Sequence, residues 1–253
     1  MKQTNYNLGL ASVSFRRHAP AEILAAMQHA GLTHIEWGSD IHAPCTDKAR
    51  LAQLATLQAQ YGISCSSYGT YFRLGETPLA ELTEYILAAK QLGTDVLRLW
   101  CGQKSGACMT AQERAHLVRQ CQGAAAIAAQ QSVTLCMECH KNTFTEHPAD
   151  AVWLMREIAS PHFRMYWQPF QWQCPAENVE NARTLAPYVE HVHVFFWRDK
   201  EKLPLADAVA DWRSYLAQLS APRILLLEFM PKDTLDELAA EAAALKQIAG
   251  EKL

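Results

Sequence analysis

The amino-acid sequence predicts a single (β/α)8 TIM barrel, an α/β fold in which eight parallel strands are surrounded by eight helices. Apolar runs typical of buried strands alternate with amphipathic helical runs, at a spacing of about 30 residues. Three of the predicted helices stop at a glycine that leads directly into the next strand. The chain has 253 residues, which matches the length of about 250 residues typical of this fold.

The predicted strands are short apolar runs, as expected for a parallel sheet that is covered on both faces. Several of them end in a charged or metal-binding side chain, and such a side chain is costly to bury without a partner. In chain order the predicted strands cover residues 6–12, 33–37, 63–68, 95–100, 132–138, 163–168, 190–196 and 223–229.

The predicted helices lie between these strands. Leu51, Leu54 and Leu57 recur at helical spacing and form one apolar stripe. Asp47 and Thr110 are predicted N-caps, because their side-chain oxygens can accept hydrogen bonds from the first helical turn. In chain order the predicted helices lie near 20–30, 47–60, 78–92, 111–130, 148–158, 176–187, 205–219 and 233–248.

Gly31, Gly62 and Gly93 each follow a predicted helix and supply the left-handed residue that turns the chain into the next strand. This repeated turn indicates one repeated βα unit. The alternative is an open doubly wound sheet, which normally carries a glycine-rich phosphate loop after its first strand. Residues 11–15 contain no glycine, so we expect a closed barrel. We see no linker and expect residues 1–253 to form one domain.

Composition limits the functional classes. The formal net charge of −3 argues against a nucleic-acid surface, which usually shows a clustered basic excess. No apolar run is long enough to span a membrane, and residues 1–5 do not begin a signal peptide, so we expect a cytoplasmic protein. The eight cysteines lie mostly in apolar runs and are expected to be free thiols. Cys136 and Cys139, three apart in a strand, point to opposite faces.

Four polar residues end consecutive predicted strands, the fifth to the eighth. They are Glu138, Gln168, His193 and Glu228. Because the carboxyl ends of barrel strands form the active face, we expect these side chains to converge there. Two carboxylates, an imidazole and an amide oxygen suit Mn²⁺, Mg²⁺, Co²⁺ or Zn²⁺. The sequence therefore predicts a divalent metal site.

Other residues of the same face are expected to contact substrate. Glu36 either binds substrate hydroxyls or pairs with Arg98. Lys104 lies in a loop after a strand, where basic side chains clamp a phosphate or carboxylate or are simply solvated. His140 shares the parity of Glu138, and Trp197 belongs to an aromatic rim that either stacks on sugar faces or packs the barrel top.

As an ordered set, the strand-end motifs resemble the sugar phosphate isomerase/epimerase family of xylose-isomerase-like TIM barrels. These motifs are Ile35-Glu36-Trp37-Gly38, Leu135 to Thr143, Tyr166-Trp167-Gln168-Pro169, His191 to Phe195 and Leu227-Glu228-Phe229. The resemblance implies one divalent metal held by Glu, Asp, His and Glu, at positions where this chain has Glu138, Gln168, His193 and Glu228. Gln168 thus replaces the usual Asp. Gln171 stands where sugar 3-epimerases of the superfamily bind substrate with a His.

A second resemblance favours another activity. Residues 12–16, 102–106 and 111–114 resemble 3-dehydroshikimate dehydratases of the same superfamily. The first resemblance predicts an isomerase or epimerase of a small sugar, sugar phosphate or related hydroxy-ketone, in which Glu138 and Glu228 transfer protons through an enediolate. A dehydratase-like lyase and a non-catalytic sugar-binding barrel are the alternatives. The expected partner is a small carbohydrate or polyol-ketone. The oligomeric state stays open, with a homodimer as one alternative.

Overall fold

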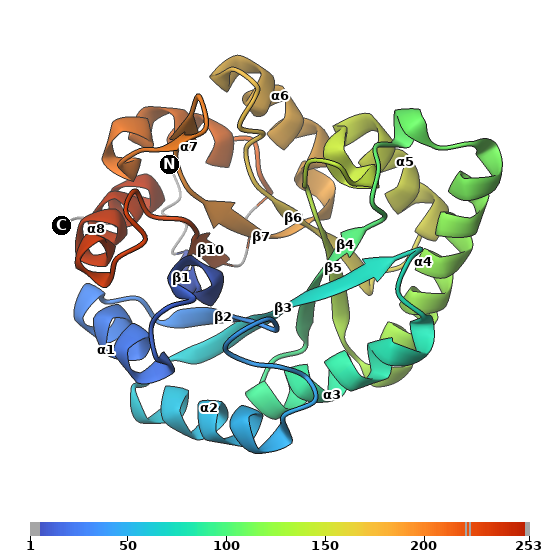
Figure 1. Cartoon of the computed structure of the whole chain (residues 1–253). Helices are drawn as coiled ribbons and strands as arrows, with labels where there is room; N and C mark the ends of the chain where they lie inside the picture. The colour runs from blue at the N-terminus through green and yellow to red at the C-terminus, as the bar shows by residue number, and fades with distance from the viewer. Residues whose placement is uncertain (1–5, 221, 223, 251–253) are drawn as a thin grey trace.

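The computed structural model describes residues 6–220, 222 and 224–250, and these form a closed parallel barrel of eight strands (Figure 1). The strand order around the barrel is β1-β10-β7-β6-β5-β4-β3-β2. The helices lie outside this ring, as Figure 1 shows. The predicted (β/α)8 TIM barrel is therefore confirmed.

The strands of the barrel lie close to their predicted positions. Neighbouring strands are parallel throughout, and β1 pairs with β10 to close the ring. Their bounds are β1 Asn7–Ala11, β2 His34–Gly38, β3 Ser64–Leu74, β4 Val96–Cys101, β5 Thr134–Glu138, β6 Phe163–Trp167, β7 Val189–Val194 and β10 Ile224–Leu227.

The helices also follow the predicted order. Gly31 and Gly93 end their helices in the left-handed conformation, with φ of 71° and 85°. The side chain of Asp47 accepts a hydrogen bond from Arg50 N, and Thr110 forms a capping box with Glu113, so both predicted N-caps are confirmed. The bounds are α1 Pro20–Ala30, α2 Lys48–Gln60, α3 Leu82–Leu92, α4 Ala111–Gln131, α5 Pro148–Ile158, α6 Pro175–Leu185, α7 Val209–Leu216 and α8 Leu238–Ala249.

Three local features differ from the expected elements. Strand β3 continues to Leu74, beyond its predicted end at residue 68. A short antiparallel hairpin, β8 (Trp197–Arg198) and β9 (Glu201–Lys202), follows β7. The segment 205–219 begins with a 3-10 turn, and α7 ends at Leu216. Residues 1–5, and residue 223 at the start of the last predicted strand, lie outside the described residues. Within the described part of the chain, no helix is long and apolar enough to cross a membrane.

The interior of the barrel is unusually polar toward the carboxyl ends of its strands. TIM barrels are typically filled by branched apolar side chains. Here Glu36, Ser67, Arg98 and His193 are buried inside the ring, while the layer between strands and helices is apolar. Buried charges persist only when they are paired or bind a cation. The fold therefore concentrates its polar chemistry at one end of the barrel.

Candidate metal centre and active site

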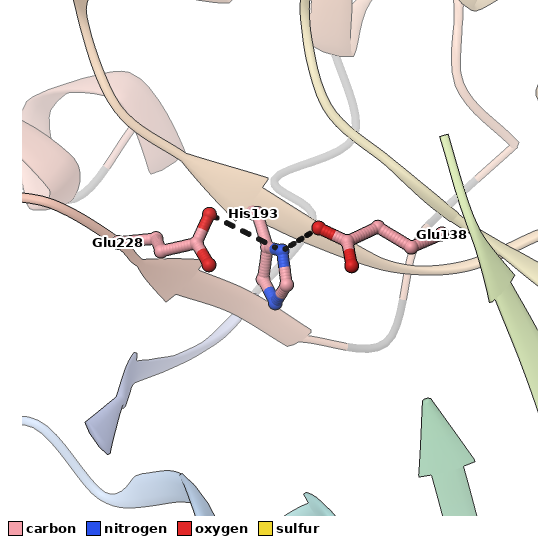
Figure 2. Close-up of side chains that lie close together, drawn as sticks. All are labelled: Glu138, His193 and Glu228. Carbon is pink, nitrogen blue, oxygen red and sulfur yellow. Dashed lines mark ion pairs between the residues drawn. The ribbon is translucent and has the colours of Figure 1, made fainter. Parts of the chain in front are cut away.

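His193, near the end of β7, is the centre of the candidate site, and its side chain is fully buried. Its Nδ1 atom faces three oxygens: Gln168 Oε1 at 3.3 Å, Glu228 Oε2 at 3.4 Å and Glu138 Oε1 at 3.6 Å. Glu138 and Glu228 reach the imidazole from opposite sides (Figure 2). The four residues predicted as metal ligands thus meet at one point.

The barrel topology explains why they meet. Strands β5, β6, β7 and β10 are consecutive neighbours in the ring. Glu138 is the last residue of β5, while Gln168 and Glu228 each follow directly after their strands. In the register of β7 and β10, His193 pairs with Leu226, two residues before Glu228. Strand ends at similar heights therefore bring the side chains together.

Arg98, on β4, connects two carboxylates beneath the mouth. Its Nε donates to Glu36 Oε1 at 3.0 Å, and its Nη1 donates to Glu138 Oε2 at 2.6 Å. Trp100 Nε1 donates to the same oxygen of Glu138. Both donors therefore occupy Oε2, and Oε1 is left facing His193. A Cβ at Gly69 would lie 2.7 Å from Glu36 and 2.8 Å from Arg98, so the absence of a side chain there makes room for this ion pair.

Glu36 supports His193 from below. Its Oε1 lies 3.4 Å from His193 Nε2, and its Oε2 accepts a hydrogen bond from Ser67 Oγ at 3.0 Å. Tyr166 OH donates in turn to Ser67 Oγ at 2.6 Å. A carboxylate behind one imidazole nitrogen fixes the ring so that the other nitrogen can bind a metal. The arrangement places Nδ1 on the side of the other three ligands.

The buried charges shift one another's pKa values. Burial alone would raise the pKa of Glu36, but Arg98 and His193 outweigh it and lower the pKa to about 2. Arg98 likewise outweighs burial at Glu138 and lowers its pKa. At Glu228 burial prevails over the attraction of His193 and raises the pKa to about 7. For His193 the carboxylates of Glu228 and Glu36 outweigh burial and raise the pKa to about 10.

A cavity of about 390 Å³ opens above these groups. Trp100 forms one wall, where its ring stacks on His140 at 4.8 Å between centroids and lies 4.0 Å from the guanidinium carbon of Arg73. Arg16 lies at another edge and is held by Asp40 and Tyr71. The cavity thus has a polar floor and partly aromatic walls, which suit a small polyhydroxy ligand.

The predicted site residues fall into three groups. Most line this cavity, namely Arg98, Glu138, His140, Gln168, Gln171, Trp197 and Glu228. Glu36 and His193 lie beneath it and are fully buried. Lys104 pairs with Glu113 and lines neither this cavity nor the larger one beside it. The substrate contacts of all these residues stay predictions. Of the two alternatives for Glu36, the structure contains the ion pair with Arg98.

Several residues of the site and of the cavity wall were not predicted from the sequence. The hydrogen bond of Ser67 to Glu36 was not predicted, and Ser67 is one of several serines at the start of β3, so its place in the sequence does not single it out. Trp172 and Phe229 also line the cavity. Both follow a predicted ligand closely in sequence, and aromatic residues just after such a strand end are candidates for a site wall.

Comparison with known proteins agrees with the geometry. The family model described as "Xylose isomerase-like TIM barrel" matches residues 24–248. The chain belongs to the xylose isomerase-like TIM barrel family. A curated relative in sequence, the 3-dehydroshikimate dehydratase of Bacillus anthracis, is 24% identical over 119 residues, which are 47% of this chain and 42% of the relative. The match therefore spans less than half the length of that protein.

Solved structures show the same fold in other members of this structural class. The probable 3-DHS dehydratase AsbF of Bacillus anthracis has a TM-score of 0.73 at 18% identity, over 96% of this chain and 99% of its own. L-ribulose 3-epimerase has a TM-score of 0.73 at 15% identity, over 97% and 95%. A xylose isomerase-like TIM barrel protein of Mycobacterium smegmatis, in complex with magnesium, has a TM-score of 0.70 at 14% identity, over 98% of both chains.

The donor atoms of this family member fit a divalent cation. Ligating atoms of Glu138, His193 and Glu228 lie within 4.8 Å of one another, and all three residues are buried. Such separations allow ligand distances of about 2.0–2.6 Å from a shared ion. The charges also balance, because Glu36 and Arg98 neutralise each other and leave two carboxylates to face a 2+ ion. The set of oxygen and nitrogen donors suits the ions predicted above.

Metal binding should therefore release protons. Without a bound metal, the raised pKa values of about 10 for His193 and about 7 for Glu228 leave both groups protonated at pH 6. A ligand must lose its proton to bind, so we expect release of about two protons per Mn²⁺ at pH 6 and about one at pH 8.5. Calorimetry in buffers of different ionisation enthalpy counts these protons. Affinity that is independent of pH over this range would exclude His193 as a ligand.

Proposed function

We propose that the protein is a metal-dependent isomerase or epimerase that removes the proton next to the carbonyl of a small sugar or related hydroxy-ketone. The observation that carries the proposal is the convergence of Glu138, Gln168, His193 and Glu228 on one point at the floor of the cavity. These four residues would hold the metal, which when bound supplies Lewis-acid stabilisation of negative charge on a substrate carbonyl oxygen.

The two carboxylates are suited to different tasks. Glu138 has one oxygen fixed by Arg98 and Trp100, and its lowered pKa keeps it ionised, so its role is to stay in place. Glu228 lines the cavity, and its Oε2 lies 3.4 Å from His193 Nδ1, within reach of a substrate bound at the metal site. We therefore assign the proton abstraction to Glu228.

This asymmetry bears on the type of reaction. An isomerisation can use one carboxylate that takes the proton from one carbon and returns it to the next. An epimerisation needs a second proton donor on the opposite face of the carbon. Glu138 reaches the site from the side opposite Glu228 (Figure 2), but its Oε2 is held by Arg98 and Trp100, and its Oε1 is the atom that would bind the metal. Isomerisation is therefore the simpler outcome for this arrangement.

A lyase of the dehydratase type is the second candidate. The 24% identical relative is a 3-dehydroshikimate dehydratase, which supports this alternative. The chemistry begins in the same way, because Glu228 would take the proton next to a carbonyl. A hydroxyl on the following carbon then leaves as water, and a double bond forms between the two carbons. One base is sufficient for this elimination.

Solvent exchange tests the proposal directly. The Mn²⁺-loaded protein is incubated in heavy water with a panel of ketoses, aldoses, their phosphates and 3-dehydroshikimate, and deuterium is located by NMR. We expect deuterium at the carbon next to the carbonyl of the true substrate. Deuterium with a new isomer supports the isomerase, and loss of water with a new aromatic absorbance supports the lyase. Binding of sugars without any exchange would support the non-catalytic barrel.

Gln168 offers a test of the metal ligands that does not need a substrate. Replacing Gln168 with Asp adds a negative charge beside His193, where Oε1 now lies 3.3 Å from Nδ1. We expect the Asp variant to bind Mn²⁺ at least about tenfold more tightly, because an ionised ligand attracts the cation more strongly than an amide. Titration at constant pH gives the two affinities. Unchanged or weaker binding would show that Gln168 does not contact the metal.

A further inference from the structure

A second and larger cavity adjoins the candidate site. Its volume is about 610 Å³, compared with about 390 Å³ for the cavity above the metal ligands. Both are lined by Lys141, by residues 169–172 of the loop between β6 and α6, and by Phe195 and Trp197. The two cavities therefore adjoin along this shared wall.

The lining of this second cavity combines aromatic surface with polar groups of both signs. Trp212 and Tyr215 of α7 are buried at its base, and Trp172 stands at its edge with 48% of its surface exposed. The ring of Trp172 lies 5.2 Å from that of Phe170 and 5.6 Å from Lys141 Nζ, and its exposed surface can serve as a flat platform for a ligand ring. Figure 1 shows α6 and α7 side by side on the rim of the barrel, where this cavity lies.

The charged groups of the cavity are mixed. Arg198 and Lys200 are accompanied by Asp199 and Asp211. Arg198, Asp199 and Lys200 are exposed, and the guanidinium carbon of Arg198 also lies 5.2 Å from the centroid of the Phe196 ring. A phosphate site would exclude carboxylates, because they repel the anion. Neutral hydroxyl groups, in contrast, can donate to aspartates and accept from basic side chains.

We propose that the second cavity binds a sugar ring attached to the reacting unit, so that the substrate is a ketose or hydroxy-ketone joined to a second glycosyl unit. The proposal rests on the proposed function for the reacting end of the molecule. The ring would lie against Trp172, with Arg198 and Asp211 contacting its hydroxyls. Chemistry takes place at Glu228, and the second cavity sets the specificity.

Keto-disaccharides provide suitable probes. Turanose, lactulose and isomaltulose each carry a free fructose unit, with the second ring attached at a different carbon. Isothermal titration of the Mn²⁺-loaded protein compares them with fructose and with fructose 6-phosphate. We expect at least one disaccharide to bind about tenfold or more tightly than fructose, since a stacked and hydrogen-bonded ring adds that much affinity.

Variants of the second cavity should reduce this preference. Two variants should each lower the ratio of disaccharide to fructose affinity by about tenfold. They are Trp172→Ala and the double variant that combines Arg198→Ala with Asp211→Ala. Trp153→Ala is the matched control, because Trp153 is also partly exposed but lines neither cavity. That variant should keep the wild-type ratio.

The outcomes separate this inference from the proposed function. Tight disaccharide binding that depends on Trp172, without any deuterium exchange, supports the second cavity and contradicts the proposed enzyme. Exchange on fructose, together with disaccharides that bind no better than fructose, overturns the second cavity and keeps the enzyme. Fructose 6-phosphate binding more tightly than every disaccharide, with loss in Arg198→Ala, would overturn the sugar assignment in favour of an anion.

Discussion

Replacing Glu228 with Gln is expected to lower turnover by about 10²–10⁴-fold, the usual contribution of a general base. The amide keeps the shape of the side chain and an oxygen that can bind a cation, but it cannot take a proton. The wild-type carboxylate is buried in the floor of the cavity, and without a metal burial raises its pKa to about 7. The variant therefore removes the proposed base and keeps an oxygen that can bind the metal.

A measurement of metal content and a control variant complete this test. Metal content, determined on the same sample, separates loss of the base from loss of the metal. Glu241→Gln is the control, because Glu241 is also buried with a pKa raised to about 7, yet it accepts hydrogen bonds from Leu205 N and lines neither cavity. The control should keep full turnover. A fully metallated Glu228→Gln protein with wild-type turnover would contradict the assignment of the base.

The corresponding change at Glu138 should behave differently. Gln at this position leaves Arg98 without one of its two carboxylates and gives Trp100 a weaker acceptor. Activity should fall, but stability should fall as well, because a buried cation loses a partner. The contrast between Glu228 and Glu138 distinguishes a proton carrier from a residue that holds the site in shape.

Most of the fold could be predicted because each βα unit carries its own local signals. Gly31 and Gly93 end their helices as expected, and Asp47 and Thr110 begin theirs. The hairpin after β7 was not predicted, since its turn residues carry no glycine. Asp199 and Lys200 adopt φ of 50° and 71° there, the left-handed conformation that a two-residue hairpin turn requires at both of its central positions.

The site was predictable as far as strand ends and parity determine it. The convergence of Glu138, Gln168, His193 and Glu228 follows from their places on consecutive strands. The pair of Arg98 with Glu36 was one of two alternatives from the sequence, whereas its contact with Glu138 was not predicted, because a long side chain can reach any of several carboxylates. The space beside Gly69, which lets Arg98 lie between Glu36 and Glu138, is seen only in the folded barrel.

Replacing Arg98 with Met is expected to destabilise the protein by about 3–5 kcal/mol, the usual cost of removing one partner from a buried ion pair. Arg98 is 4% exposed and lies between Glu36 and Glu138. Met fills much of its volume but leaves two buried carboxylates without their cation. Their pKa values should then rise, because burial is no longer opposed by a positive charge. Urea denaturation of the metal-free protein measures the loss.

The loss should depend on pH in a defined direction. At pH 8, Glu36 and Glu138 of the variant either stay charged without a partner or bind protons at a free-energy cost that rises with pH. At pH 5 this cost is smaller, so the variant recovers part of its stability. Removing Glu36 as well, in Glu36→Gln with Arg98→Met, should restore part of it at pH 8. Arg183→Met breaks an exposed pair with Glu180 and should cost less than about 1 kcal/mol. A similarly small cost for Arg98→Met would mean that water reaches the cluster and that its charges are not held by one another.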